Sequence, residues 1–186
     1  VFSFRRRARK IYEIYDRLIF AGLGQQSDVE AVRLAALEFA SREGFQRSEA
    51  DVTIQRVATA MSNPLKRAFG DFGASPLVAR SLFGEVGETP EEDLYYILDY
   101  DGDFAPSRRH ASVAGTLEAG ERLDEQLKTV DPSISPEDAL VRLRETWRSL
   151  ETEGDDREVG LKEEAILLER ASGRENRFRL LTPEEF

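Results

Sequence analysis

The amino-acid sequence predicts an α+β fold in which helices cover both outer faces of largely antiparallel sheets, a four-layer αββα sandwich. Strand-like and helix-like segments come in blocks: two strands, two helices, several strands, two helices and a closing hairpin. A chain of 186 residues that is 40% hydrophobic is long and apolar enough to bury one substantial core. We therefore expect a single domain over residues 1–186.

The first block is a hairpin over residues 10–24. Polar and apolar side chains alternate up to Tyr15, which is typical of a strand with two different faces. Asp16 and Arg17 predict a tight polar turn, and the apolar run Leu18 to Leu23 predicts the returning strand. One face of the first strand is expected to hold Ile11, Glu13 and Tyr15, and the other Tyr12 and Ile14.

Two helices are predicted after the hairpin. Ser27 and Glu30 have the spacing of a capping box, in which a hydroxyl and a carboxylate bind free backbone amides at a helix start. A second helix is expected to open near Ser48 and Asp51 and to end at Asn63–Pro64, because proline lacks a backbone amide. The buried stripes are predicted to be Val29, Val32, Ala36, Phe39 and Ala40 in the first helix, and Ile54, Val57, Ala58 and Met61 in the second.

Three strands are predicted in the middle of the chain. Residues 76–86 and 94–100 are rich in apolar and aromatic side chains and are separated by an acidic loop. We expect these two strands to be neighbours in one sheet. Asp101–Gly102 is a dipeptide typical of a chain reversal. A short third strand is expected at residues 111–114, ended by Gly115–Thr116.

The last block is a second helix pair followed by a hairpin. Ser135 as a cap and Pro136 at the first helical position predict the start of the second of these helices. The apolar stripes are predicted to be Leu117, Leu123 and Leu127 in one helix, and Leu140, Leu143, Trp147 and Leu150 in the other. Residues 161–169 and 177–181 are predicted to form the hairpin, with one helical turn at 182–186.

Composition excludes several classes of protein. A formal net charge of −10 does not suit a protein that binds nucleic acid through phosphate contacts. Cysteine is absent, which removes disulfides, thiolate catalysis and cysteine-based zinc sites, and fits a reducing compartment. His110 is the only histidine and follows a polar loop, so we expect a loop residue rather than a metal ligand. No apolar run is long enough to cross a bilayer, and we expect a cytoplasmic protein that uses no metal or cofactor.

Three groups of residues that look like ligand sites or acid pairs are better explained as structure. Asp99, Asp101 and Asp103 alternate like calcium ligands but lack the later acidic ligand, which favours a turn. Gly22–Leu23–Gly24 lacks the third glycine of a dinucleotide site. In the acid pair Glu163–Glu164, the two side chains point to opposite faces of an extended chain and have no evident general-acid partner.

One ordered set of segments runs along nearly the whole chain. It consists of Lys10–Ile11, Asp16, Gly22–Leu23, the helix pair from Ser27 to Met61, Tyr100–Asp101–Gly102, Gly115–Thr116, Ser135 with the helix behind it, and the closing hairpin. In this order the segments resemble the proteasome core-particle subunit family. The chain is most similar to actinobacterial-type alpha subunits of bacteria, at residues 14–17 and 41–53. The shared order, rather than any single motif, carries the resemblance.

The resemblance implies the fold of N-terminal nucleophile hydrolases, with subunits assembled in seven-membered rings. Catalytic beta subunits of the family use an N-terminal threonine. The alpha-like body of this chain implies a noncatalytic subunit of a threonine endopeptidase complex. A homo-heptameric ring would template the ring of beta subunits, admit unfolded protein substrates, and dock a ring-shaped AAA+ ATPase or other activator. Most of the first two strands of the family is not found before Val1, so we expect the domain to be incomplete at its N-terminus.

Lys10 is the residue to which the resemblance assigns a role. In alpha subunits the matching lysine lies in a pocket between neighbouring subunits and binds the terminal carboxylate of an activator or ATPase tail. A lysine ammonium is a compact charge that pairs well with a carboxylate. From the residues alone, Lys10 is a surface lysine before a strand. Clustered arginines beside it would add a basic rim or pair with acids; they are Arg5, Arg6, Arg7 and Arg9.

Three hypotheses stay open from the sequence. The first is the noncatalytic alpha-type subunit, which predicts a heptameric ring without peptidase activity of its own. The second is a threonine peptidase of the beta or ancestral type whose start is missing. In beta subunits, the position that matches Lys10 looks like that of the catalytic lysine. The third is a degenerate family member that serves only as a scaffold, which predicts failure to assemble with a beta subunit.

Overall fold

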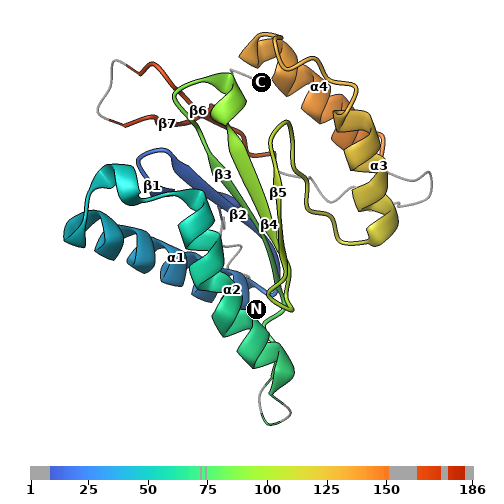
Figure 1. Ribbon diagram of the computed structural model, residues 1–186. Helices are drawn as coiled ribbons and strands as arrows, with labels where there is room; N and C mark the ends of the chain where they lie inside the picture. Colours follow the sequence, from blue (N-terminus) through green and yellow to red (C-terminus); the bar gives the residue numbers. More distant parts are fainter. Residues whose placement is uncertain (1–8, 72, 74, 151–162, 173–175, 183–186) are drawn as a thin grey trace, which may run out of the picture.

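The computed structural model describes residues 9–71, 73, 75–150, 163–172 and 176–182. Over these residues it contains one five-stranded sheet, one two-stranded sheet and four α-helices (Figure 1). The helices are α1 (Gln26–Gln46), α2 (Ile54–Gly70), α3 (Leu117–Leu127) and α4 (Pro136–Arg148), with short 3₁₀ segments η1 (Glu49–Asp51) and η2 (Pro90–Glu92). The predicted mixed α+β class is confirmed. None of these helices is long and apolar enough to cross a membrane.

The larger sheet is antiparallel throughout, and each strand pairs with the next one along the chain. Its strands are β1 (Ile11–Tyr15), β2 (Leu18–Gly24), β3 (Ala79–Glu85), β4 (Leu94–Leu98) and β5 (Phe104–Ser107). The predicted hairpin at Asp16–Arg17 and the predicted pairing of the two middle strands are confirmed. Because the order is β1-β2-β3-β4-β5, strand β1 lies at an edge of this sheet.

Strand β1 is irregular near its end. Its pairing with β2 shifts by one residue between Glu13 and Tyr15. Ile14 is buried, and both Tyr12 and Tyr15 pack against the core. The prediction that Tyr15 shares a face with Glu13 is therefore wrong, because an extra residue in one strand of a pair turns the following side chain to the other face.

The third predicted middle strand is also wrong. Residues 111–114 have no regular structure, and the strand that follows the turn is β5, at Phe104–Ser107. The turn itself is confirmed: the Gly102 amide donates to the Asp99 carbonyl at 2.9 Å, and Gly102 has a φ of 83°, which favours glycine. Such a tight reversal brings the chain back against β4 at once, so pairing starts well before the predicted position.

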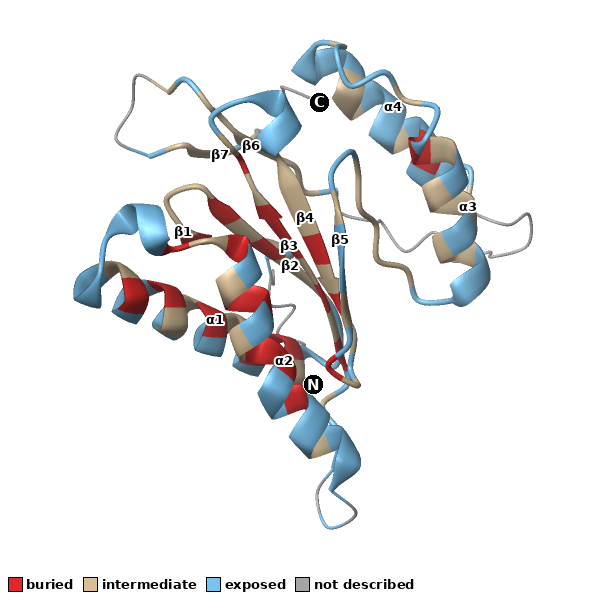
Figure 2. Ribbon diagram, viewed as in Figure 1, coloured by how far each residue is buried: buried red, intermediate tan, exposed pale blue. Residues whose placement is uncertain are grey.

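Helices α1 and α2 cover one face of the five-stranded sheet and form the main core with it (Figures 1 and 2). The buried stripes predicted for α1 and α2 are confirmed except at Phe39, which is only partly buried. Buried positions include Val29, Val32, Ala36 and Ala40 in α1, and Ile54, Val57, Ala58 and Met61 in α2. Phe20 and Phe83, from β2 and β3, meet edge to face at a centroid distance of 5.3 Å.

The predicted start of α1 is wrong in its chemistry. The helix begins at Gln26 without a side-chain cap, and the Ser27 hydroxyl contacts Gln25 and Asp28 instead of a backbone amide. Glu30 pairs with Arg33 one turn later, so no capping box forms. The capping hydroxyls lie elsewhere: Ser48 caps η1, and Thr53 caps α2.

The predicted end of α2 at Asn63–Pro64 is wrong. The helix continues through Pro64 to Gly70. Proline inside a helix costs about 3 kcal/mol, so tertiary contacts must outweigh this loss. Met61 and Leu65 are buried on either side of Pro64, and the buried Ser62 hydroxyl donates to the Gly102 carbonyl at 2.5 Å.

Helix α4 begins at the predicted serine cap and proline, and α3 follows Gly115–Thr116 as expected. The Thr116 hydroxyl accepts the Ala119 amide at 3.2 Å, and the Ser135 hydroxyl accepts the Asp138 amide at 3.1 Å. The predicted buried stripe of α4 is wrong at Leu143 and Trp147, which are 49% and 38% exposed, whereas Leu140 and Leu150 are partly buried and Thr146 is buried. Helix α4 packs against α3, and Ser149 at its end bonds to Arg122 and Gln126 of α3.

Strands β6 (Ile166–Leu168) and β7 (Phe178–Leu180) form the closing hairpin, which is shorter than predicted. Figure 1 shows α1 and α2 on one side of the larger sheet and α3 and α4 on the other. The predicted helical turn at 182–186 falls mostly outside the described residues. The basic segment Arg5 to Arg7 lies outside them as well.

Candidate docking site at the first strand

Lys10 precedes β1, and its side chain is exposed. Within the described part of the chain, Lys66 and Lys128 form ion pairs with carboxylates, and Lys10 does not. Arg9 is exposed beside it, and the Arg9 carbonyl accepts a hydrogen bond from the Tyr12 hydroxyl at 2.8 Å. The ordinary chemistry of such a site is electrostatic attraction of an anion, of which a carboxylate is the natural example.

Glu164 contacts the backbone at this position from the opposite end of the chain. Its Oε1 atom accepts the amide of Lys10 at 3.1 Å and the amide of Ile11 at 2.9 Å. Its neighbour Glu163 points to α4, with Oε2 2.8 Å from Arg144 Nε and Oε1 3.3 Å from Arg148 Nη2. The expectation that the pair Glu163–Glu164 diverges is therefore confirmed.

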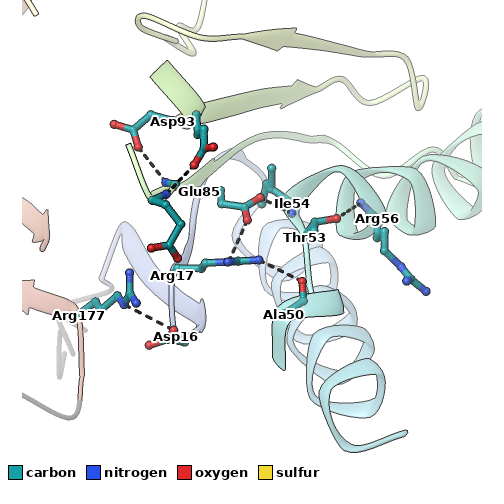
Figure 3. Close-up of polar contacts among 12 residues, drawn as sticks. Asp16, Arg17, Ala50, Thr53, Ile54, Arg56, Glu85, Asp93 and Arg177 are labelled. Atoms are coloured by element: carbon teal, nitrogen blue, oxygen red, sulfur yellow. Dashed lines mark hydrogen bonds and ion pairs between the residues drawn. The ribbon is translucent and has the colours of Figure 1, made fainter. Parts of the chain in front are cut away.

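The turn at the other end of β1 is held by an acid from β3 and a base from the turn itself (Figure 3). Arg17 Nε lies 3.0 Å from Glu85 Oε1, and Arg17 Nη2 donates to the Ala50 carbonyl at 3.3 Å. Glu85 Oε2 also accepts the amide of Ile54, the first residue of α2, at 2.8 Å. This arrangement joins the β1–β2 turn, the end of β3 and the start of α2, so the hairpin that begins at Lys10 has a fixed base.

The β6–β7 hairpin adds contacts along β1. Asn176 Nδ2 donates to Glu13 Oε2 at 3.0 Å. Arg177 Nε lies 3.7 Å from Asp16 Oδ2, as Figure 3 shows. Together with Glu164, these contacts bind the closing segment of the chain to both ends and the middle of the edge strand. The backbone that carries Lys10 is therefore supported by residues more than 150 positions away.

A further guanidinium fixes the hairpin to the β3–β4 loop. Arg170 Nη2 lies 2.8 Å from Asp93 Oδ2, and Arg170 Nη1 donates to the carbonyls of Gly87 and Thr89. Hydrogen bonding to Asp93 raises the pKa of Arg170. Burial raises the pKa of the Tyr95 phenol, and the Asp93 carboxylate adds to this effect.

The other polar groups singled out by the sequence serve local structure. Asp99 pairs with Arg80 at 3.1 Å, and Asp103 pairs with Lys66 at 3.2 Å, on either side of the confirmed turn. No group of three or more metal-ligating side chains gathers within the described ranges. These aspartates therefore stabilise the reversal between β4 and β5.

His110 lies in the loop before α3, as predicted, but its side chain is only 19% exposed. Its Nε2 atom is 2.9 Å from Asp124 Oδ1. Hydrogen bonds from Lys128 and then from His110 lower the pKa of Asp124. The histidine thus connects the loop to α3, and its observed partner is a carboxylate that also binds a lysine.

Comparison with known proteins decides the family. A family model described as Proteasome subunit matches residues 3–153, which is most of the chain. The chain belongs to the proteasome subunit family. The resemblance inferred from the order of its segments is confirmed, and Lys10 and the five-stranded sheet lie within the matched region of this proteasome subunit.

Curated relatives give the type of subunit to which this family member is similar. "Proteasome subunit alpha" of Xylanimonas cellulosilytica is 37% identical over 121 residues, covering 64% of this chain and 49% of the relative. The alpha subunit of Thermomonospora curvata is 32% identical over 157 residues (84% and 66%), and that of Streptomyces avermitilis 28% identical over 181 residues (97% and 70%). The chain spans about half the length of the first curated relatives it matches.

The site contains contacts that the sequence did not predict. Glu164, Arg17 and Glu85 fix the two ends of β1, and none of them belongs to a motif of its own. The sequence shows Glu163 and Glu164 as a pair of adjacent acids, but it does not indicate which group either carboxylate binds. Such partners are determined by the tertiary fold, because the amides that Glu164 binds lie 154 and 153 residues away in the chain.

Proposed function

We propose that this chain is an alpha-type, noncatalytic subunit of a proteasome core particle. The match of the proteasome subunit model over residues 3–153 carries the proposal. The curated relatives named above support the alpha type, since each bears the name "Proteasome subunit alpha". Because the chain covers only about half of the first relatives, its activity, substrates and partners are all part of the proposal.

In this role the chain forms a homo-heptameric ring in the cytoplasm. The ring templates a ring of catalytic beta subunits and controls the entry of unfolded protein substrates. A ring-shaped AAA+ ATPase or another activator docks on it, so the subunit supports ATP-dependent protein degradation. The Lys10 ammonium, which pairs with no carboxylate among the described residues and extends from an anchored strand, supports the docking of a terminal carboxylate at this position.

The proposal includes the four-layer sandwich. The face of the larger sheet that points away from α1 and α2 carries a partly exposed apolar row. Cross-strand pairing places Ile11, Ala21, Leu82, Ile97 and Ala105 in this row. On the far side, Leu143 and Trp147 of α4 are also exposed. A second sheet that extends the β6–β7 hairpin between these surfaces would cover both.

Assembly is the decisive test of the function. We would express the complete protein that contains this chain, alone and with a beta-type subunit from the same genome, and measure particle mass by native mass spectrometry and symmetry by electron microscopy. We expect sevenfold rings that stack on the beta ring, with peptide hydrolysis only when the beta subunit is present. Monomers in both samples, or hydrolysis by the complete protein alone, would contradict the proposal.

A further inference from the structure

Two consecutive backbone amides converge on one carboxylate at the start of β1. Glu164 Oε1 lies 3.1 Å from the Lys10 nitrogen and 2.9 Å from the Ile11 nitrogen. Strand β1 is an edge strand, and the Ile11 amide points away from its partner β2 toward Glu164. Without Glu164 these amides would bind water, and the first residues of the strand would lose their fixed position.

The two acids of the pair Glu163–Glu164 have different tasks. Glu164 binds the backbone amides of Lys10 and Ile11 and forms no ion pair with the Lys10 side chain. Glu163 is engaged by Arg144 and Arg148 of α4. Of the two, only Glu164 is placed to set the backbone from which the Lys10 side chain extends.

We propose that Glu164 is the positioning residue of the Lys10 docking site. The inference rests on the proposed docking role of Lys10 and adds the residue that determines its geometry. Fixing the backbone of a residue costs conformational entropy, and a site that is already fixed avoids this loss when a ligand binds. Glu164 restricts the backbone of Lys10 and Ile11 before a carboxylate binds.

Two conservative variants separate geometry from charge. Glu164→Gln removes the charge but keeps an oxygen at the same distance from the backbone, which still accepts both amides. Glu164→Asp keeps the charge but shortens the side chain by one methylene, so its oxygen no longer reaches both amides. Glu163→Gln is the matched control, because it removes the same charge from the adjacent residue without touching β1.

The first measurement is hydrogen exchange at the Lys10 and Ile11 amides in the complete protein. We expect Glu164→Gln and Glu163→Gln to keep the native protection, and Glu164→Asp to exchange at least about tenfold faster at these two amides. Circular dichroism checks that each variant folds. Native protection in Glu164→Asp, or loss of protection in Glu164→Gln alone, would overturn the inference, and neither result depends on the role of Lys10.

The second measurement is binding of a fluorescent hexa-alanine peptide with a free terminal carboxylate, compared with the same peptide carrying a terminal amide. We expect the assembled native ring to prefer the free carboxylate by about tenfold, and Lys10→Ala to lose this preference. Glu164→Asp is expected to lose most of it, while Glu164→Gln and Glu163→Gln stay within about threefold of native. An unchanged preference in Lys10→Ala would refute the docking role, whereas loss in Lys10→Ala with an unchanged Glu164→Asp would refute only the inference about Glu164.

Discussion

Two serines of the core, Ser81 and Ser62, show what a single hydroxyl contributes. Both are buried, and the Ser62 hydroxyl donates to the Gly102 carbonyl, whereas Ser81 Oγ on β3 has no partner in the described part of the protein. A buried hydroxyl without a partner costs about 1–3 kcal/mol. We expect Ser81→Ala to raise the free energy of unfolding by about 0.5–1 kcal/mol, as measured by urea denaturation.

Ser62→Ala is the matched control for Ser81→Ala. It deletes the same atom from an equally buried position, but it also removes the donor to Gly102, so we expect the free energy of unfolding to fall by about 1 kcal/mol. The two variants should therefore differ in sign. Equal destabilisation by both would contradict the prediction, because it would mean that the Ser81 hydroxyl makes a hydrogen bond that stabilises the fold.

Among the elements, the start of α1 gives the sharpest contrast between local and tertiary chemistry. Asp28 Oδ2 accepts the Val78 amide at 2.8 Å, which fastens the first turn of α1 to the chain that enters β3. The Ser27 hydroxyl has no backbone partner among the described residues. We expect Asp28→Ala to lower the free energy of unfolding by about 1–2 kcal/mol and Ser27→Ala by less than about 0.5 kcal/mol in thermal or urea denaturation.

This prediction inverts what the sequence alone implies, because a capping box would make Ser27 the costly residue at about 1 kcal/mol. Larger destabilisation by Ser27→Ala than by Asp28→Ala would show that the helix start follows the local motif after all. The carboxylate at the positive end of the helix also favours Asp28, so its effect should shrink at high salt.

The same contrast explains how much of the fold the sequence could predict. The turn at Asp16–Arg17 and the cap at Ser135, whose partners lie within a few residues, were predicted correctly, whereas the capping box at Ser27 was not. The end of α2 was not predicted correctly, because burial of the residues around Pro64 outweighs the cost of a proline inside a helix. The burial pattern of α4 was not predicted correctly either. An apolar stripe on a helix indicates which side chains favour burial, but it does not indicate which element packs against them.

The candidate site was predictable only in part for a related reason. Lys10 was found by its place in an ordered set of family segments, and its exposure agrees with a docking role. Glu164 was not assigned to the site, because no local pattern links residues 154 positions apart. A prediction of such contacts needs the fold that brings the closing hairpin beside β1.

For the whole molecule, the docking of the β6–β7 hairpin on the larger sheet predicts an alkaline sensitivity. Arg170 binds Asp93 across 77 residues, and the Tyr95 phenol lies half-buried near both groups. Burial first, and then Asp93, raises the pKa of Tyr95 above its ordinary value of 10.0, while Arg170 opposes the shift. The folded protein therefore holds this proton at pH values where the unfolded chain releases it.

The sign of the effect follows from proton linkage. A group whose pKa is raised by folding contributes stability that is fully present below its unfolded pKa and is lost as the pH rises through the folded pKa. The loss from one such group is at most about 1.4 kcal/mol per pH unit. Tyr95→Phe has no phenol to ionise, so its unfolding free energy should decline less steeply than that of the native protein between pH 9 and about pH 11.

Urea denaturation at a series of pH values measures this difference directly, because other alkaline groups titrate in both proteins and cancel. Parallel curves for native protein and Tyr95→Phe would mean that the phenol ionises as easily in the folded as in the unfolded state. A gap that widens above pH 10 would instead mean that the surface between the hairpin and the larger sheet stays closed to water around Tyr95.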